Sequence, residues 1–234
     1  MSIKKFTIYG ERCSGTNYLE KLILKNFVVT LTWEYGFKHF FGFNNNLDTS
    51  DDTLFICIVR DIHDWLNSFF REPHHLPLRY ENISLEDKID KFLNSEFWSF
   101  DDSNENRDIN KEIMEDRNIY NGSRYQNIFE LRHIKLKYMF EDLPKKVKNY
   151  ILIRYEDLIN DFTFTMTRIK NKGLKINNYD NIFKNSDNYK KYKNKKFDKN
   201  IIKESFITKK EILQNPNLIP FYENKLGYIK VNYT

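Results

Sequence analysis

The sequence predicts an α/β protein with a three-layer P-loop-type fold, in which helices flank a central parallel sheet of about four or five strands. Short apolar runs at 53–59 and 149–154 are typical of strands buried on both faces. Amphipathic helical segments separate them, and strands that alternate with helices indicate right-handed parallel crossovers. A glycine-containing loop joins the first strand to the first helix, and 234 residues are ample for one core.

The predicted fold is organised around the first strand and the loop that follows it. Residues 3–9 alternate apolar and polar side chains, and apolar residues recur at helical spacing after Thr16. Between them, Gly10 and Gly15 permit a sharp turn and close approach of a ligand. We expect Ser14 or Thr16 to cap the helix, whose first-turn N–H groups then form an anion site.

The loop differs from the Walker A sequence. Gly10 and Gly15 have the Walker A spacing, but Thr16-Asn17 replaces the lysine and hydroxyl that contact phosphates and Mg²⁺. One interpretation is a phosphate cradle without nucleotide hydrolysis. The other is an ordinary strand-to-helix turn that contains glycine.

The remaining elements follow from periodicity and from residues that break helices. A second strand is predicted at 27–33, and a phenylalanine-rich loop at 34–43. Helices are predicted at 62–70, at 84–93 with Ser84 as N-cap, at 125–140, and from Glu156 to about Lys170. The carboxyl ends of the parallel strands then deliver the loops that follow Tyr9, Val59 and Arg154 to one edge, where ligands bind.

We expect a single domain over 1–234 with two unusual segments. Residues 95–121 contain an acidic stretch, for which we expect an excursion or a lid. Residues 184–210 hold ten lysines against three acidic residues, so this segment alone exceeds the chain's net charge of +5. It is either a polyanion-binding patch or a solvated surface.

Composition narrows the class of protein. The two cysteines indicate no disulfide framework, and no Cys/His cluster has zinc spacing, so we expect no metal. No signal peptide or membrane-spanning run is evident, so we expect a cytoplasmic protein without a membrane span. We expect no nucleic-acid partner.

A possible second anion-binding group follows the central strand. Arg60 ends the 53–59 strand, and Ser68 lies two turns into the next helix. A guanidinium and a hydroxyl from these positions can converge on one anion. The alternative is a surface arginine paired with Asp61 or Asp64, beside a solvated serine.

Three segments together resemble the landmarks of the sulfotransferases that use 3′-phosphoadenosine-5′-phosphosulfate (PAPS). They are the 12–19 loop, the stretch from Val59 to Ser68, and the run Arg154-Tyr155-Glu156-Asp157-Leu158. The resemblance covers roughly 3–162, and 36–39 and 65–75 resemble a bacterial- and viral-type branch. It implies that the loop wraps the 5′-phosphosulfate, that Arg60 and Ser68 hold the 3′-phosphate, and that Tyr155 lies near the adenine. The implied loop residues are Arg12, Cys13, Ser14, Gly15, Thr16, Asn17 and Tyr18.

Two features depart from the cytosolic members of that family. They place a lysine just before Ser-Gly-Thr, where this chain has Cys13 preceded by Arg12. They also end with an Arg-Lys-Gly segment on the 3′-phosphate, which this chain lacks. The lysine-rich 190–196 stretch could substitute for it.

The resemblance implies in-line transfer of a sulfuryl group from PAPS to a hydroxyl or amine, which leaves 3′-phosphoadenosine-5′-phosphate (PAP). Arg12 and Lys38 are candidates to stabilise the moving charge. His39 is the first candidate for the base, and Glu11 is the second. The acceptor is open among sugars, peptides and small metabolites. The alternatives are a P-loop kinase-like phosphotransferase and a non-catalytic nucleotide- or polyanion-binding protein.

Overall fold

The computed structural model describes residues 2–43, 46–76, 83–101, 111–177, 182–186 and 204–229. These residues group into two compact units, each treated separately below. Unit 1 comprises Met1–Asp61 and Met139–Lys203, and unit 2 comprises Ile62–Tyr138 and Glu204–Thr234.

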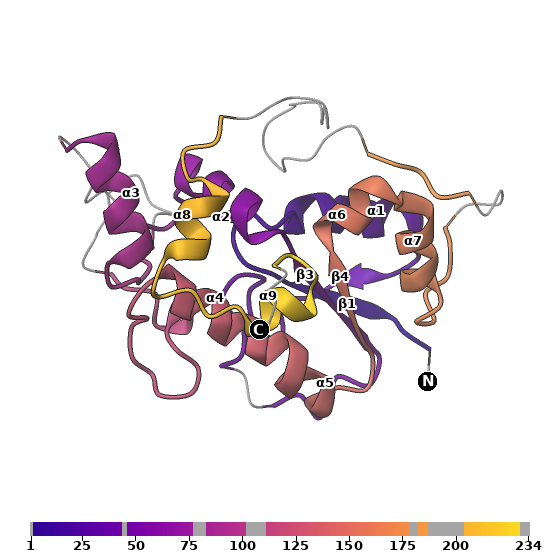
Figure 1. Cartoon of the computed structure of the whole chain (residues 1–234). Coiled ribbons are helices and arrows are strands. Elements are labelled where there is room, and N and C mark those ends of the chain that lie inside the picture. Colours follow the sequence, from indigo (N-terminus) through magenta and orange to yellow (C-terminus); the bar gives the residue numbers. More distant parts are fainter. Residues whose placement is uncertain are drawn as a thin grey trace. The chain divides into compact units, whose positions relative to one another are not determined.

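Unit 1 is built on a parallel four-stranded sheet in the order β2-β1-β3-β4. Its strands are β1 (Lys5–Tyr9), β2 (Thr30–Leu31), β3 (Thr53–Val59) and β4 (Tyr150–Arg154), all paired in parallel (Figure 1). The register places Ile8 beside Ile56 and Ile58 beside Ile153. The prediction of an α/β fold with a parallel sheet flanked by helices is therefore confirmed.

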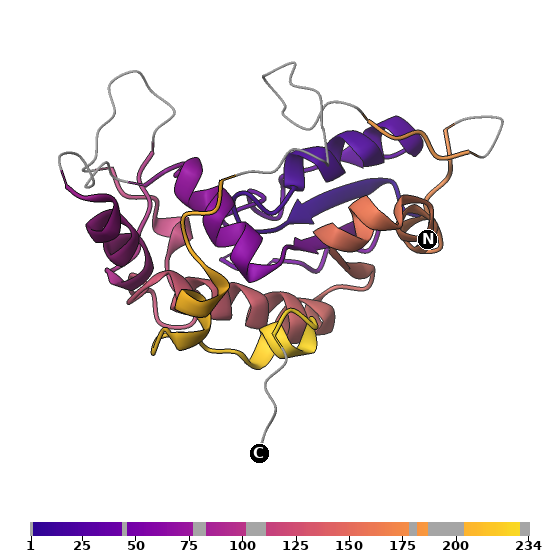
Figure 2. The same cartoon turned by 45° about the horizontal axis from the view of Figure 1, so that its top comes forward.

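One face of the sheet carries the main apolar core of unit 1. The helices α1 (Thr16–Asn26), α6 (Tyr155–Asn160) and α7 (Phe162–Lys170) cover it (Figure 2). Alternate strand residues such as Ile8, Ile56 and Ile153 pack there against Leu19 and Leu22 of α1. Each of these five side chains is fully buried, so the period-two pattern of the strands becomes one continuous core.

Aromatic residues of the 33–41 loop cover part of the opposite face. The ring of Tyr9 stacks on Phe41 at 4.8 Å, and Tyr35 lies 5.3 Å from Phe55 of β3. The Tyr9 hydroxyl also donates to the Tyr35 carbonyl at 2.6 Å. These contacts fix the loop against the sheet, close to the carboxyl end of β1.

Three element boundaries differ from the predicted ones. The strand predicted at 27–33 is reduced to β2, because Phe27 instead forms an antiparallel bridge with Ile176. The helix predicted from Glu156 to about Lys170 is split into α6 and α7, because Asp161 leaves the helical conformation and accepts from the N–H of Phe164. The helix predicted at 125–140 begins later, as α4 (Ile128–Lys137), since the side chain of Asn127 caps it.

The other helices are α2 (Ile62–Arg71), α3 (Leu85–Asn94), α5 (Leu143–Lys146), α8 (Lys209–Gln214) and α9 (Phe221–Lys225), with a 3₁₀ turn at Met114–Asp116 and a π turn at Tyr138–Asp142. Ser84 caps α3 as predicted, accepting from the N–H of Asp87. No helix among the described residues is both long enough and apolar enough to cross a membrane.

Unit 2 has its own aromatic core and a buried ion pair. Phe69 of α2 packs against Trp65 of the same helix and against Phe92 and Phe97, at ring distances of 5.7–6.0 Å. Arg132 of α4 donates to both carboxylate oxygens of Glu223 on α9, at 2.7 and 3.0 Å. This buried ion pair thus links α9, which lies in the last described stretch of the chain, to α4.

The acidic excursion predicted at 95–121 is described at both of its ends. Burial raises the pKa of Glu112, but hydrogen bonds from Arg124 and Arg117 outweigh it and hold this pKa below its ordinary value. Asp116 accepts from the buried Lys135 of α4 and from Ser99. These bonds anchor the described ends of the excursion within unit 2, and a role as a lid stays a prediction.

Candidate functional site

The loop from Gly10 to Gly15 leaves the carboxyl end of β1, as predicted, and its two glycines are needed for space. A Cβ on Gly10 would lie 2.7 Å from the Ile58 carbonyl oxygen. A Cβ on Gly15 would lie 2.4 Å from a ring carbon of Tyr155, and Gly15 has φ +97°. Any side chain at Gly15 would therefore clash with Tyr155 and strain the backbone.

The start of α1 differs from the prediction that Ser14 or Thr16 caps it. The N-cap is Gly15, and no side-chain cap is formed among the described residues. The hydroxyl of Ser14 instead donates to the Glu11 carbonyl at 2.6 Å, which closes the loop on itself. Since Cys13 also has a positive φ of 63°, two left-handed residues curl the backbone around the amino end of α1.

Arg60 and Tyr155 meet at this loop. Arg60 Nη1 donates to the Cys13 carbonyl at 3.0 Å, and its guanidinium lies 4.9 Å from the centre of the Tyr155 ring. Cys13, Arg60 and Tyr155 follow β1, β3 and β4, so three distant segments converge at one edge of the sheet. The strand order reverses between β1 and β3, where ligands bind in open α/β sheets.

The 36–40 loop lies against the same edge through reciprocal bonds with Gly10. The N–H of Gly10 donates to the Lys38 carbonyl at 3.0 Å. Nδ1 of His39 lies 2.7 Å from the Gly10 carbonyl oxygen. Because a carbonyl oxygen can only accept, this contact requires a proton on Nδ1, and the neutral ring then carries its lone pair on Nε2.

Lys38 is buried, with an exposed fraction of 6 %, and its ammonium contacts α1. Nζ donates to the side-chain oxygen of Asn17 and lies 3.6 Å from a carboxylate oxygen of Glu20. It also lies 5.7 Å from the Phe37 ring and 5.8 Å from the Trp33 ring. The lysine thus places a charge beside the first turn of α1.

Glu11 and Arg12 are both buried in the loop, with exposed fractions of 1 % and 3 %. The guanidinium of Arg12 lies 5.8 Å from the centre of the Phe40 ring. The loop therefore contains a buried carboxylate and a buried guanidinium on consecutive residues.

Tyr18, which follows the loop on α1, contacts the start of the lysine-rich segment. Its hydroxyl donates to Asn185 Oδ1 at 2.6 Å. The amide of Asn26 donates to the Lys184 carbonyl at 2.9 Å and accepts from the Lys184 N–H at 2.6 Å. These bonds hold the start of the lysine-rich segment against α1. Residues 187–203 of that segment lie outside the described residues.

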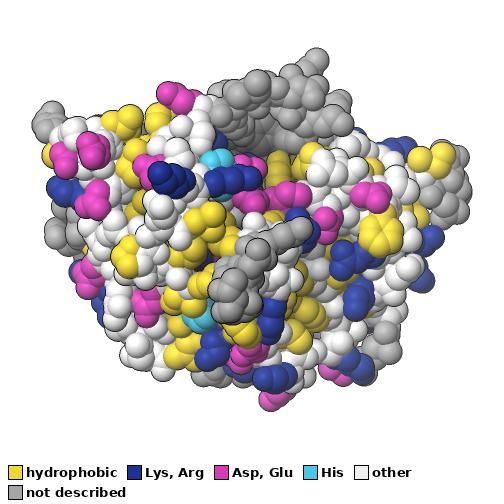
Figure 3. All heavy atoms as spheres, in the orientation of Figure 1, with side chains coloured by type: hydrophobic (Ala, Val, Ile, Leu, Met, Phe, Trp, Pro, Cys, Tyr) yellow, Lys and Arg dark blue, Asp and Glu magenta, His cyan; other side chains and the backbone are white. Residues whose placement is uncertain are grey.

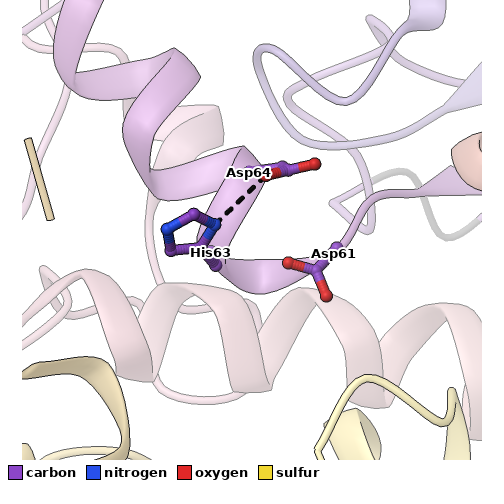
Figure 4. Close-up of side chains that lie close together, drawn as sticks. All are labelled: Asp61, His63 and Asp64. Carbon is purple, nitrogen blue, oxygen red and sulfur yellow. Dashed lines mark hydrogen bonds and ion pairs between the residues drawn. The ribbon is translucent and has the colours of Figure 1, made fainter. Parts of the chain in front are cut away.

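The predicted site residues divide between the two units. Ser68 belongs to unit 2, where it is half-buried on α2. Nearby on α2, His63 Nδ1 lies 3.1 Å from Asp64 Oδ1, as Figure 4 shows together with Asp61. The other predicted residues gather in unit 1; they are Glu11, Arg12, Cys13, Ser14, Gly15, Thr16, Asn17, Tyr18, Lys38, His39, Arg60 and Tyr155.

Two groups at this edge were not predicted. Glu20 pairs with Lys38, and Glu156 accepts from the N–H of Asp61 at 2.8 Å. The position of Glu20 three residues after Asn17 puts both on one side of α1, and this spacing could have identified it. Glu156 gave no comparable signal, because its partner is 95 residues away.

The two cysteines lie in different surroundings. Cys13 is partly exposed in the loop, and Cys57 is fully buried in β3. Burial raises the pKa of the Cys57 thiol well above its ordinary range. Neither forms a disulfide.

Comparisons with known proteins give a distant likeness among solved structures. No family model matches the chain, and no curated protein matches it. Among solved structures, the crystal structure of mouse sulfotransferase SULT7A1 complexed with PAP matches with a TM-score of 0.41 and 13 % identity. The match covers 76 % of this chain and 61 % of that one, so this chain spans less than two thirds of its length. A likeness of this degree carries no functional argument.

Proposed function

We propose that the chain is a PAPS-dependent sulfotransferase. A sulfuryl group moves from PAPS to a hydroxyl or amine of an acceptor, with one S–O or S–N bond formed, the S–O bond to the phosphate broken, and PAP released. The loop 12–18 would hold the phosphosulfate, Arg60 and Ser68 the 3′-phosphate, and Tyr155 the adenine. We expect no metal, because positioned cations and N–H groups can stabilise the leaving phosphate.

The convergence of Cys13, Arg60 and Tyr155 carries this proposal. A stacked arginine–tyrosine pair beside an uncapped helix start offers a flat ring, a fixed cation and oriented N–H groups within one site. A nucleotide with phosphates presents the matching base and anions. The three segments that make this site are those on which the sulfotransferase resemblance rests.

The charges around the loop support group transfer as well as binding. Lys38 and Arg12 lie beside the first turn of α1 and within the loop, where they can stabilise charge on the transferred group. In the tautomer that this contact requires, the neutral ring of His39 carries its lone pair on Nε2. A general base accepts a proton through such a lone pair. Glu11 is the alternative base.

Ligand-induced stabilisation tests the proposal. PAP should raise the unfolding temperature more than AMP does, because Arg60 has a 3′-phosphate to bind. Arg60→Ala should remove most of that difference, since a lost charged partner in a desolvated site costs about 2–5 kcal/mol. Arg168→Ala is the matched control, because Arg168 also donates to a backbone carbonyl, that of Leu152, but from α7.

Equal stabilisation by AMP and PAP in the wild-type protein would contradict the proposal. Preference for ATP with Mg²⁺ would instead indicate a kinase-like phosphotransferase. PAP binding without turnover on a library of sugars, peptides and small metabolites would indicate a nucleotide-binding module. On the face drawn in Figure 3, basic and acidic side chains of the described residues are interspersed.

A further inference from the structure

The pairing of β3 with β4 is continued by side chains beyond the last residues of the two strands. The last backbone pair of this parallel register is Val59 with Arg154. One residue further along each chain, the guanidinium of Arg60 lies 4.9 Å from the centre of the Tyr155 ring. The contact between the two strands therefore extends to the edge of the sheet at which the candidate site lies.

Two residues beyond the last backbone pair, a carboxylate accepts from a backbone N–H. Oε1 of Glu156, in the first turn of α6, accepts from the N–H of Asp61 at 2.8 Å, although the two residues are 95 apart in the chain. Oε2 of the same carboxylate lies 4.0 Å from Nε of Arg154. A hydrogen bond to an ionised acceptor is about twice as strong as a neutral one. The bond thus fastens the chain that leaves β3 to the start of α6.

This bond acts on the backbone of Arg60. The N–H of Asp61 belongs to the same planar peptide unit as the Arg60 carbonyl, so Glu156 fixes the peptide from which the arginine side chain extends. At the other end of that side chain, Nη1 of Arg60 donates to the Cys13 carbonyl at 3.0 Å. Ordering an arginine costs much rotamer entropy, and a fixed backbone reduces the number of positions that the guanidinium can reach.

We propose that Glu156 is a positioning residue for the 3′-phosphate: by accepting from the N–H of Asp61, it fixes the backbone that directs Arg60 toward the nucleotide. The inference rests on the proposed function, because it takes from it the assignment of Arg60 to the 3′-phosphate. Glu156 acts through Arg60 and need not touch the nucleotide.

The test isolates the contribution of the 3′-phosphate. PAP differs from AMP only by this group, so the dissociation constant of AMP divided by that of PAP, both from calorimetry, measures how well the protein recognises it. We call this quotient the PAP preference. A general loss of folded structure weakens both ligands and leaves the PAP preference unchanged, whereas a displaced Arg60 lowers it.

Two conservative variants separate the hydrogen bond from the negative charge. Glu156→Asp keeps the charge, which the amino end of α6 favours, but its carboxylate is one methylene shorter and falls short of the Asp61 N–H. It should lower the PAP preference about tenfold, the effect of one lost charged hydrogen bond. Glu156→Gln loses the charge but keeps an oxygen at the same reach, so its PAP preference should stay within about threefold of wild type.

Asp157→Asn is the matched control. Asp157 is the next residue of α6, and its Oδ1 lies 3.9 Å from Nη1 of the same Arg154. This variant removes an acidic charge beside the same arginine without altering the bond to Asp61. Its PAP preference should equal that of wild type.

A double-mutant cycle tests whether Glu156 acts through Arg60. Arg60→Ala alone should remove most of the PAP preference. Adding Glu156→Asp to Arg60→Ala should lower it no further, because the group that Glu156 positions is already absent. A further loss in the double variant would show that Glu156 acts by another route and would overturn the inference.

The remaining outcomes distinguish this inference from the proposed function. Equal affinity of the wild-type protein for AMP and PAP overturns the proposed function. A wild-type PAP preference that Glu156→Asp leaves intact overturns only the role of Glu156. The same holds if Glu156→Gln loses as much as Glu156→Asp, or if Arg60→Ala keeps the preference.

Discussion

At the scale of single residues, the direction of one hydrogen bond assigns a tautomer. The Gly10 carbonyl can only accept, so the nearby His39 nitrogen must donate. The same carbonyl belongs to the glycine whose N–H donates to Lys38, so the backbone that forms the loop also orients the candidate base. The base and the loop would therefore move together.

His39→Ala should lower turnover by about 10²–10⁴ while PAP binding stays close to that of wild type, because a general base acts on the acceptor and not on the nucleotide. Steady-state turnover with an active acceptor, or slow PAPS hydrolysis with water as the acceptor, measures the first quantity, and calorimetry measures the second. His133→Ala is the control, since His133 lies on α4 in unit 2, 5.1 Å from the Tyr222 ring.

The competing assignment of the base has an opposite signature. Should His39→Ala keep full turnover while Glu11→Gln loses it, the base is the carboxylate. Retained turnover in both variants would mean that the acceptor enters already deprotonated.

At the scale of elements, the packing of the loop on α6 depends on the absence of a Cβ at Gly15. The ring of Tyr155 occupies the space where Gly15 would carry a Cβ. The start of α1 and the start of α6 are thereby held at van der Waals contact. A change at Gly15 must disturb both elements.

Gly15→Ala should destabilise the fold by more than Gly173→Ala and should weaken PAP binding. Both glycines have a similar left-handed φ, +97° and +102°, and this backbone strain costs about 1–3 kcal/mol in each variant. At Gly173 the nearest atom to a new Cβ is 3.8 Å away, whereas at Gly15 it is 2.4 Å. Denaturant unfolding measures the difference, which the additional change Tyr155→Ala should reduce. Equal losses in the two glycine variants would contradict the clash.

The elements were predictable where local pattern decides them. β3 matches its predicted span, because seven consecutive buried residues leave no other interpretation. The break at Asp161 was missed, because an aspartate inside an amphipathic pattern is compatible with helix until its side chain caps a new one. β2 is shorter than predicted, because its length depends on where Phe27 pairs across the chain.

The sequence predicted that the loop, Arg60 and Tyr155 come together at one edge of the sheet, but it did not predict their partners. The loop glycines, Arg60 and Tyr155 were identifiable from sequence order and motif. The Lys38–Glu20 pair and the Ser14 bond to Glu11 depend on how two segments fold against each other, which no spacing rule specifies. The cap failed as a prediction for this reason: Ser14 has the right chemistry, but its hydroxyl is used within the loop.

At the scale of the whole molecule, the two units have separate cores, and the candidate site residues other than Ser68 belong to unit 1. Its core joins α1, α6 and α7 to the sheet. The core of unit 2 is aromatic and is supported by Arg132 and Glu223. Ligand effects on backbone opening should therefore be uneven along the chain.

PAP should slow amide hydrogen exchange most in the peptides that cover 10–18, 38–40 and 154–156 of unit 1, because binding orders the loop and its neighbours. Mass spectrometry of peptides with and without PAP measures this pattern. Arg60→Ala should abolish it at the same PAP concentration. Protection confined to 204–229 would place the ligand elsewhere and would contradict the site.

The unequal burial of the two cysteines has a practical consequence. Because Cys57 is sealed inside β3 and holds its proton, the folded chain offers one thiol to a maleimide dye, that of Cys13. That thiol lies on the loop itself, beside the carbonyl that Arg60 contacts. The native sequence thus already carries a unique attachment point for a fluorescent reporter at the loop, without any engineered cysteine.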